Sequence, residues 1–227
     1  MRRGWGAGQH FTALLTIRPR SFAFRLHYPD DPLCRIHPYG GIPPQPGRRG
    51  TASLSGNLSS IIAATAQWLV RAYPAAGGTM NAALAEAQAR QAVTVAAWLR
   101  YPTVTESALV AMAGPGGSAR LEWLLGTEPL EVDGADIAWR TWVDEVVASW
   151  AAALLASPAL ADTAVAALAD CEHTAASPVD FRRLTAPDEF DRKAAPLLRH
   201  PDLLAPVADL HHAQLLERLH SDPVGAG

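Results

Sequence analysis

Two groups of potential metal ligands lie in the last third of the chain. Cys171 and His173 stand at the end of one expected helix, and Asp209 and His212 lie three positions apart on another. Residues at i and i+3 share one helix face, so Asp209 and His212 can approach one ion together. Zinc in proteins is held by three or four converging ligands. The spacing does not bring the two groups together, so the sequence predicts no metal site and leaves these four residues as weak candidates.

Other motifs with known chemistry do not occur in the sequence. The glycine-rich segment 114–117 precedes an expected helix, and helix N-termini bind phosphate. However, no Lys-Ser or Lys-Thr pair follows in the register of a phosphate-binding loop. No dinucleotide fingerprint, HExxH motif or serine nucleophile motif is present. The sequence therefore indicates no catalytic residue and no cofactor, and it favours a protein that is not an enzyme.

Helical periodicity begins near Met80. Asn81 is expected to cap a helix that runs to Leu99. Its apolar stripe consists of Ala85, Ala89, Ala92, Val95, Ala96 and Leu99. Thr103 and Glu106 form a capping box that opens a second helix through Met112, and Ser118 is expected to cap a third, short helix to Leu125. Segment 127–137 is ambiguous between a minimal hairpin and a loop, and we favour the loop.

The clearest helical pattern starts at Trp139. Its apolar stripe comprises Trp139, Trp142, Val143, Val146, Trp150, Ala153 and Leu154. Arg140 and Asp144 are placed for an i,i+4 ion pair on the opposite face. Three Trp residues on one stripe can stack a ligand, but large aromatic side chains more often supply core area. We therefore interpret this helix as the centre of the domain.

Three later helices are expected at about 159–171, 188–200 and 202–220, with Pro206 trimming or bending the start of the last. A related corner occurs three times: two bulky residues end a helix, and Pro102, Pro158 or Pro201 follows. This corner resembles that of α-solenoid repeats such as the HEAT class, although its period is not fixed. The sequence predicts an all-α compact bundle of about six helices, with a short irregular α-solenoid as the alternative.

The charge of the chain changes sign at Met80. Residues 1–79 carry nine Arg against two Asp, whereas residues 80–227 carry twenty acidic and ten basic residues. We therefore expect a helical domain at 80–220, a disordered tail at 221–227, and a basic, poorly structured segment at 1–79. Within that segment, a helix capped by Ser59 or Ser60 and stopped before Pro74 fits the pattern. Segment 1–79 is either a leader or basic arm, or it lies upstream of a true start at Met80.

Composition restricts the partners and the compartment. No run of about 18 apolar residues predicts a membrane span, and two cysteines do not make a disulfide framework. The acidic residues 80–227 argue against a nucleic-acid surface there. Abundant Arg, Ala, Gly and Pro with one Lys indicate a GC-rich genome, and we expect a bacterial, cytoplasmic protein.

By elimination, the sequence favours a non-catalytic module for protein–protein interaction, regulation or assembly. One alternative is a helical enzyme or metal protein that uses the His and Asp residues of the last helix. A second is an assembly chaperone, because the segment Leu99-Arg-Tyr-Pro102 resembles, over a few residues, a helix corner of all-α assembly chaperones of the nitrate-reductase type. Partner, substrate and oligomeric state do not follow from the sequence.

Overall fold

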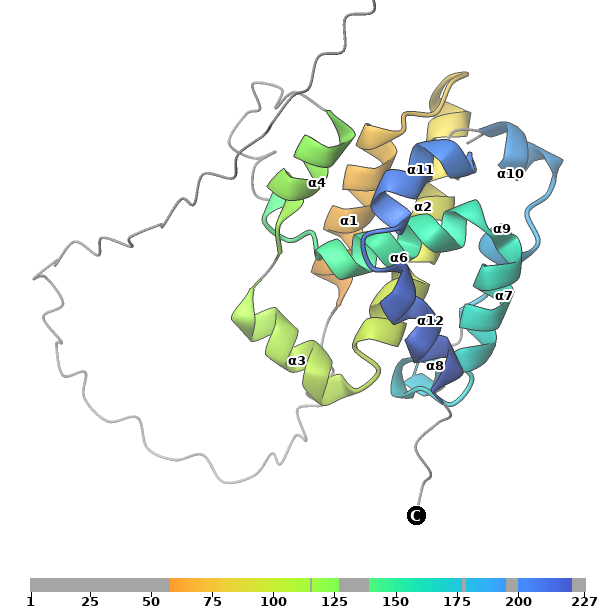
Figure 1. Cartoon of the computed structure of the whole chain (residues 1–227). Helices are drawn as coiled ribbons and strands as arrows, with labels where there is room; N and C mark the ends of the chain where they lie inside the picture. The colour runs from red at the N-terminus through yellow and green to blue at the C-terminus, as the bar shows by residue number, and fades with distance from the viewer. Residues whose placement is uncertain (1–57, 115, 127–138, 177–178, 195–199, 222–227) are drawn as a thin grey trace, which may run out of the picture. The chain divides into compact units, whose positions relative to one another are not determined.

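The computed structural model describes residues 58–114, 116–126, 139–176, 179–194 and 200–221. These residues form helices and no strands, which confirms the all-α prediction (Figure 1). The helices are α1 (Ser59–Ala72), α2 (Thr79–Arg100), α3 (Val104–Ala113), α4 (Ser118–Leu125), α6 (Glu145–Ala156), α7 (Pro158–Ala167), α8 (Glu172–Ala176), α9 (Arg182–Thr185), α10 (Glu189–Ala194), α11 (Pro201–Ala208) and α12 (His212–His220). None of these described helices combines the length and apolar character that a membrane crossing requires.

Helices α2 and α6 form the centre of the fold. α1 packs on α2, α11 packs on α6, and α7, α9, α10 and α12 pack around this pair. In a solenoid each repeat contacts only its neighbours in sequence. Here α6 contacts α1, α2, α7, α11 and α12, so the arrangement is a bundle.

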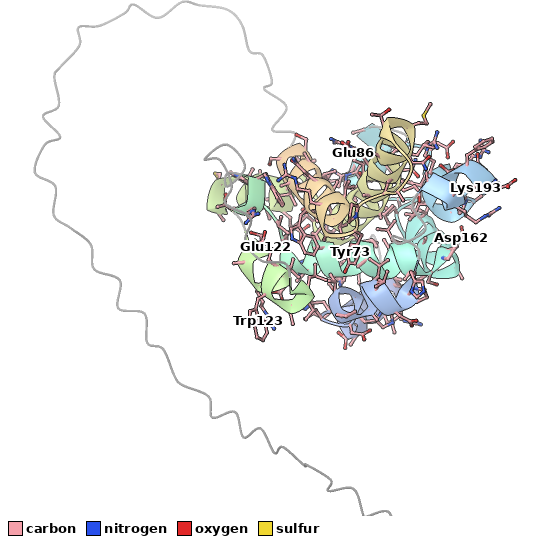
Figure 2. All side chains as sticks on the ribbon, turned by 90° about the horizontal axis from the view of Figure 1, so that it is seen from above. Tyr73, Glu86, Glu122, Trp123, Asp162 and Lys193 are labelled. Carbon is pink, nitrogen blue, oxygen red and sulfur yellow. The ribbon has the colours of Figure 1, made fainter. Side chains whose placement is uncertain are left out.

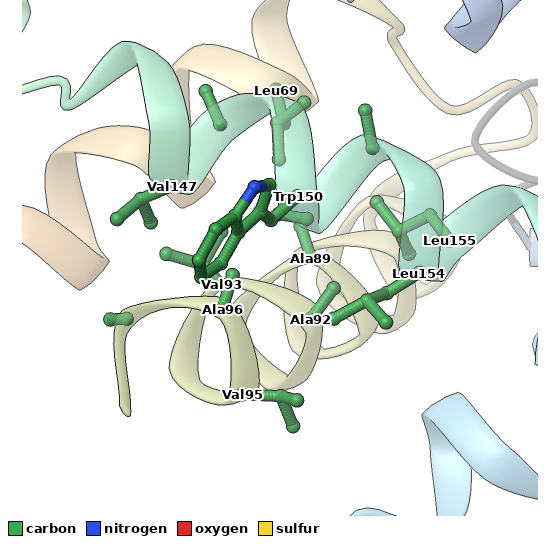
Figure 3. Packing of buried hydrophobic residues seen from close by; sticks show 14 of the residues in the cluster. Leu69, Ala89, Ala92, Val93, Val95, Ala96, Val147, Trp150, Leu154 and Leu155 are labelled. Atoms are coloured by element: carbon green, nitrogen blue, oxygen red, sulfur yellow. The ribbon is translucent and has the colours of Figure 1, made fainter. Parts of the chain in front are cut away.

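Alanines of α2 and larger side chains of α6 make the core between the two helices. The stripe expected on α2 is buried throughout, from Ala85 to Leu99. Trp150 of α6 is 3 % exposed, and Figure 3 shows its ring beside Ala89, Val93 and Ala96 of α2. Small residues on α2 let α6 approach closely, and the Trp ring fills the space that remains.

Helix α1 lies ahead of Met80, where we expected the helical domain to start, and it belongs to the same core as α2. Helix α1 forms at the predicted place, although its N-cap residue is Leu58 and neither serine, and Ile61, Trp68 and Leu69 are buried in the common core. The charge change at Met80 did not predict that α1 belongs to the core, because α1 contains a single charged residue, Arg71. Apolar spacing decides packing, and charge balance reports mainly on the exposed surface.

The helix expected from Trp139 onwards is interrupted: Trp139 and Arg140 are helical, a turn follows at 141–142, and α6 begins at Glu145. The side chain of Asp144 caps it, accepting hydrogen bonds from the backbone N–H of Val146 at 2.9 Å and of Val147 at 3.4 Å. The expected Arg140–Asp144 pair is therefore wrong, and Arg140 pairs with Glu122 of α4 at 3.2 Å instead. The spacing of the Trp residues suggested a continuous helix through Asp144, but Asp144 is the N-cap residue at which α6 starts.

Other boundaries differ by a few residues. Asn81 does not cap α2: its amide donates to the carbonyl oxygen of Ala76 at 2.8 Å, and Gly78, at a φ of 92°, occupies the N-cap position. The expected helix 202–220 is two helices, because the chain turns at residues 209–211, and Pro206 lies inside the first of them. Segment 127–137, part of the expected helix 188–200, and tail residues 222–227 lie outside the described residues.

Candidate functional site

His173 and Cys171 lie near the C-terminal end of α2 and contribute to packing there. The His173 ring stacks on Trp98 with centroids 5.6 Å apart, and its Nε2 is 2.7 Å from the carbonyl oxygen of Tyr101. A carbonyl oxygen only accepts, so Nε2 carries the hydrogen of this bond. Cys171 Sγ lies 3.3 Å from the hydroxyl of Thr174. Both side chains therefore have structural partners.

A serine lies beside this histidine, although 66 residues separate them in the chain. Ser107 Oγ is 3.3 Å from His173 Nε2, a distance compatible with a nucleophile and its base. However, Nε2 already donates to Tyr101 and has no lone pair for the serine proton. Ser107 is fully buried, and its hydroxyl donates to the carbonyl oxygen of Thr103 at 3.1 Å. The pair is a partly buried structural contact, and no local sequence motif predicts it.

Asp209 and His212 flank the turn between α11 and α12, which side chains of α6 hold in place. Ser149 Oγ donates to the carbonyl oxygen of Ala208 at 2.9 Å and accepts from the N–H of His211 at 3.0 Å. Trp150 Nε1 donates to the carbonyl oxygen of His211 at 3.1 Å. The His211 ring pairs with Glu145 at 2.9 Å. These contacts fix the backbone that carries Asp209 and His212.

The side chains of Asp209 and His212 have no hydrogen-bond partner within the described part of the chain. They lie at a pocket of about 350 Å³ between the α6–α7 corner and helices α11 and α12. Apolar residues form most of its lining: Ala153, Ala156, Leu160, Pro201, Ala205 and Ala208. Ser157 completes it at the start of α7. The structure thus joins two of the sequence candidates to a cavity that the sequence did not suggest.

The described residues contain no group of three or more His, Cys, Asp and Glu side chains that could hold a metal ion. In particular, Cys171 and His173 do not join Asp209 and His212 in such a group. The four candidates therefore do not converge on one metal site within the described residues.

A second feature is the exposed apolar surface of α3. Seven of its ten residues are apolar, but Ser107 is its only buried residue. Leu109 and Met112 are 55 % and 77 % exposed. On the following helix, α4, Trp123 is 78 % exposed, and Figure 2 shows it pointing away from the helices of the core. Neighbouring exposed apolar side chains often mark an interaction site, whereas single exposed apolar side chains are common on any protein surface.

Comparison with protein-family models, curated proteins and solved structures finds no match to this chain.

Proposed function

We propose that this protein is a non-catalytic module that binds another protein through the exposed face of α3. The observation that carries the proposal is that α3 has an apolar sequence and leaves Leu109 and Met112 in solvent. Exposing large apolar side chains forgoes the free energy of their burial, about 1.5–3 kcal/mol for each side chain fully buried. A binding partner would recover that free energy.

Contacts at both ends hold α3 in position. At its N-terminus, Thr103 and Glu106 form a capping box, and the N–H of Val104 donates to Glu172 Oε2 at 2.8 Å. Beyond its C-terminus, Gly116 packs so closely that a Cβ there would collide with the carbonyl oxygen of Val143. A helix of this length is marginal alone in water, so these end contacts support it. A surface fixed before binding loses little conformational entropy when a partner docks.

The charges of α3 define the chemistry of the partner. Glu106 is the only charged residue of the helix, and its carboxylate already accepts from the N–H and the hydroxyl of Thr103. The middle and end of α3 therefore present apolar, uncharged surface. The complementary partner is a protein with an apolar, uncharged helix face or groove, and charged residues belong at the rim of the interface. A client of an assembly chaperone would fit this description.

Site-specific photocrosslinking in the native host tests the proposal. A photoreactive amino acid in place of Met112 should give one adduct of defined mass. The same substitution at Met80, which is 71 % exposed on α2, is the matched control and should give none. Adding Leu109→Glu should abolish the adduct without changing the thermal midpoint. Identical products at both positions, or none at Met112, would contradict the proposal.

We further propose that the protein works in the cytoplasm of a bacterium. The abundance of Arg, Ala, Gly and Pro with a single Lys, which is typical of proteins from GC-rich genomes, and the presence of only two cysteines, Cys34 and Cys171, support this setting. Fractionation of the host cells, with detection in the cytosolic, membrane and periplasmic fractions, tests it.

A further inference from the structure

We infer that the pocket beside α12 binds a hydrocarbon chain that ends in an ammonium group, either a free alkylamine or a lysine side chain of a peptide. This site does not involve α3 and is independent of the function proposed above. Three features carry this inference: the apolar lining of the pocket, the position of Asp209, and the lack of a cationic partner for that carboxylate among the described residues.

The lining suits an unbranched hydrocarbon chain. Four alanines, Ala153 and Ala156 of α6 with Ala205 and Ala208 of α11, leave open the space of about 350 Å³ between these helices. Larger side chains at these four positions would fill the pocket. Small-molecule sites combine such apolar walls with a few polar groups at defined positions. Each methylene that leaves water for this lining contributes to affinity.

Asp209 determines the charge of the ligand. It is the C-cap residue of α11 and stands two residues before the N-cap of α12, so its carboxylate lies between the negative end of one helix dipole and the positive end of the next. No cationic side chain among the described residues pairs with it. Asp209 is exposed at the rim of the pocket, where its carboxylate is accessible to a ligand. A bound ammonium group would offset both the carboxylate and the helix C-terminus.

The remaining polar groups of the pocket do not favour an anion. The N-terminus of α7 would attract one, but the Ser157 hydroxyl already accepts from the N–H of Leu160 at 3.3 Å. The N-terminus of α12 lies beside His212, and the Asp209 carboxylate opposes its attraction for anions. A ring nitrogen of His212 provides a second acceptor for an ammonium hydrogen. The pocket is therefore matched to a cation with an apolar body.

Methyl NMR on the full chain labelled at alanine methyl groups tests the site. Butylammonium should shift the Ala156 and Ala205 methyl signals in a saturable way. Butanol and pentanoate, which carry the same butyl chain, should bind more weakly, and pentanoate most weakly. Asp209→Asn should weaken butylammonium binding by up to about fivefold, the limit for a solvent-exposed ion pair, and leave butanol binding unchanged. Equal binding of all three probes, or no saturable shift, would overturn the inference.

Two further measurements separate binding from a structural role. Without ligand, Asp209→Asn should leave the thermal midpoint nearly unchanged, because the carboxylate is exposed and the effects of the two neighbouring helix ends on it oppose each other. A lowered midpoint would make Asp209 a structural residue and overturn the inference. Met112→Glu, which alters only α3, should leave butylammonium binding unchanged, so failure of the α3 proposal does not affect this test. A capped lysine that binds as well as butylammonium identifies a peptide source, and weaker binding identifies a free amine; both results support the site.

Discussion

The hydroxyl of Tyr101 donates to the carboxylate of Asp144 and so joins the end of α2 to the start of α6. The other carboxylate oxygen of Asp144 caps α6 through Val146 and Val147. Burial and, to a smaller extent, this hydrogen bond raise the pKa of Tyr101 above its usual range, so the hydroxyl keeps its proton. One carboxylate thus fixes the relation between the two central helices of the bundle.

This junction makes a quantitative prediction for two substitutions. Asp144→Ala removes a helix cap and should cost about 1–2 kcal/mol of the free energy of unfolding. Tyr101→Phe removes one hydrogen bond and should cost about 0.5–1.5 kcal/mol. The double variant should cost less than the sum, because both changes break the same bond. Urea denaturation of the four proteins in this cycle measures the coupling. Strictly additive costs would show that the Tyr101–Asp144 bond contributes no coupling energy.

The free energy of unfolding at alkaline pH should depend on Tyr73. Its hydroxyl donates to the carbonyl oxygen of Leu203 at 3.0 Å, and burial raises its pKa to about 12. In the unfolded chain this pKa is about 10. Below pH 10 both states hold the proton, and the contribution of Tyr73 to stability is complete. As the pH rises from 10 to 12, the unfolded state alone loses the proton, and the free energy of unfolding falls by up to about 1.4 kcal/mol per pH unit.

Tyr73→Phe provides the control for this prediction. The variant should be less stable at neutral pH by about 0.5–1.5 kcal/mol, the value of one hydrogen bond. Its stability should then fall less steeply between about pH 10 and pH 12 than that of the original protein. Urea midpoints at several pH values in this window measure both slopes. Parallel curves for the two proteins would exclude Tyr73 as a source of the alkaline loss.

Patterns confined to one or two helical turns were predictable from the sequence. The capping box at Thr103 and Glu106 is present, and Pro158 and Pro201 occupy the first helical positions that the corner motif predicts. The buried stripe of α2 also follows its periodicity. Each of these patterns depends on residues that are close in the chain, so local geometry suffices to predict them.

Features that depend on distant partners were missed. Arg140 pairs with Glu122 rather than with Asp144, because the backbone of α6 takes the Asp144 carboxylate as its cap. The pocket beside Asp209 requires α6 and α11 to cross at alanines, and the Ser107–His173 contact joins residues 66 positions apart. Spacing along one helix contains no information about which other helix will lie against it.

The terminal helix should bind no zinc tightly, a prediction that rests on its ligands. Asp209 and His212 can supply two ligands across the turn between α11 and α12, whereas His211 is committed to Glu145 at 2.9 Å. Elemental analysis of protein purified without a histidine tag should find well under one zinc per chain. His212→Ala should leave that value unchanged. Stoichiometric zinc that disappears in this variant would restore the metal-protein alternative.

Helix α1 supplies the last prediction, which reverses the expectation drawn from the charge change at Met80. Ile61 and Trp68 are each 2 % exposed and Leu69 is fully buried, and the helix packs on both α2 and α6. Burial of three such side chains is worth roughly 5–9 kcal/mol, which is comparable to the total stability of about 5–15 kcal/mol typical of a domain. A shortened protein that begins at Met80 should therefore lose cooperative unfolding and expose apolar surface of α2.

A second shortened protein, beginning at Gly50, keeps α1 and is the matched control. It should unfold with nearly the midpoint of the full chain. Trp68→Ala in the full chain is a graded version of the same test and should cost about 3–5 kcal/mol, as expected for a large aromatic side chain removed from a core. If the protein that begins at Met80 unfolded cooperatively at the midpoint of the full chain, the core would not need α1. Because α1 covers one side of α2 while α6 covers another, we expect instead that the bundle cannot close without it.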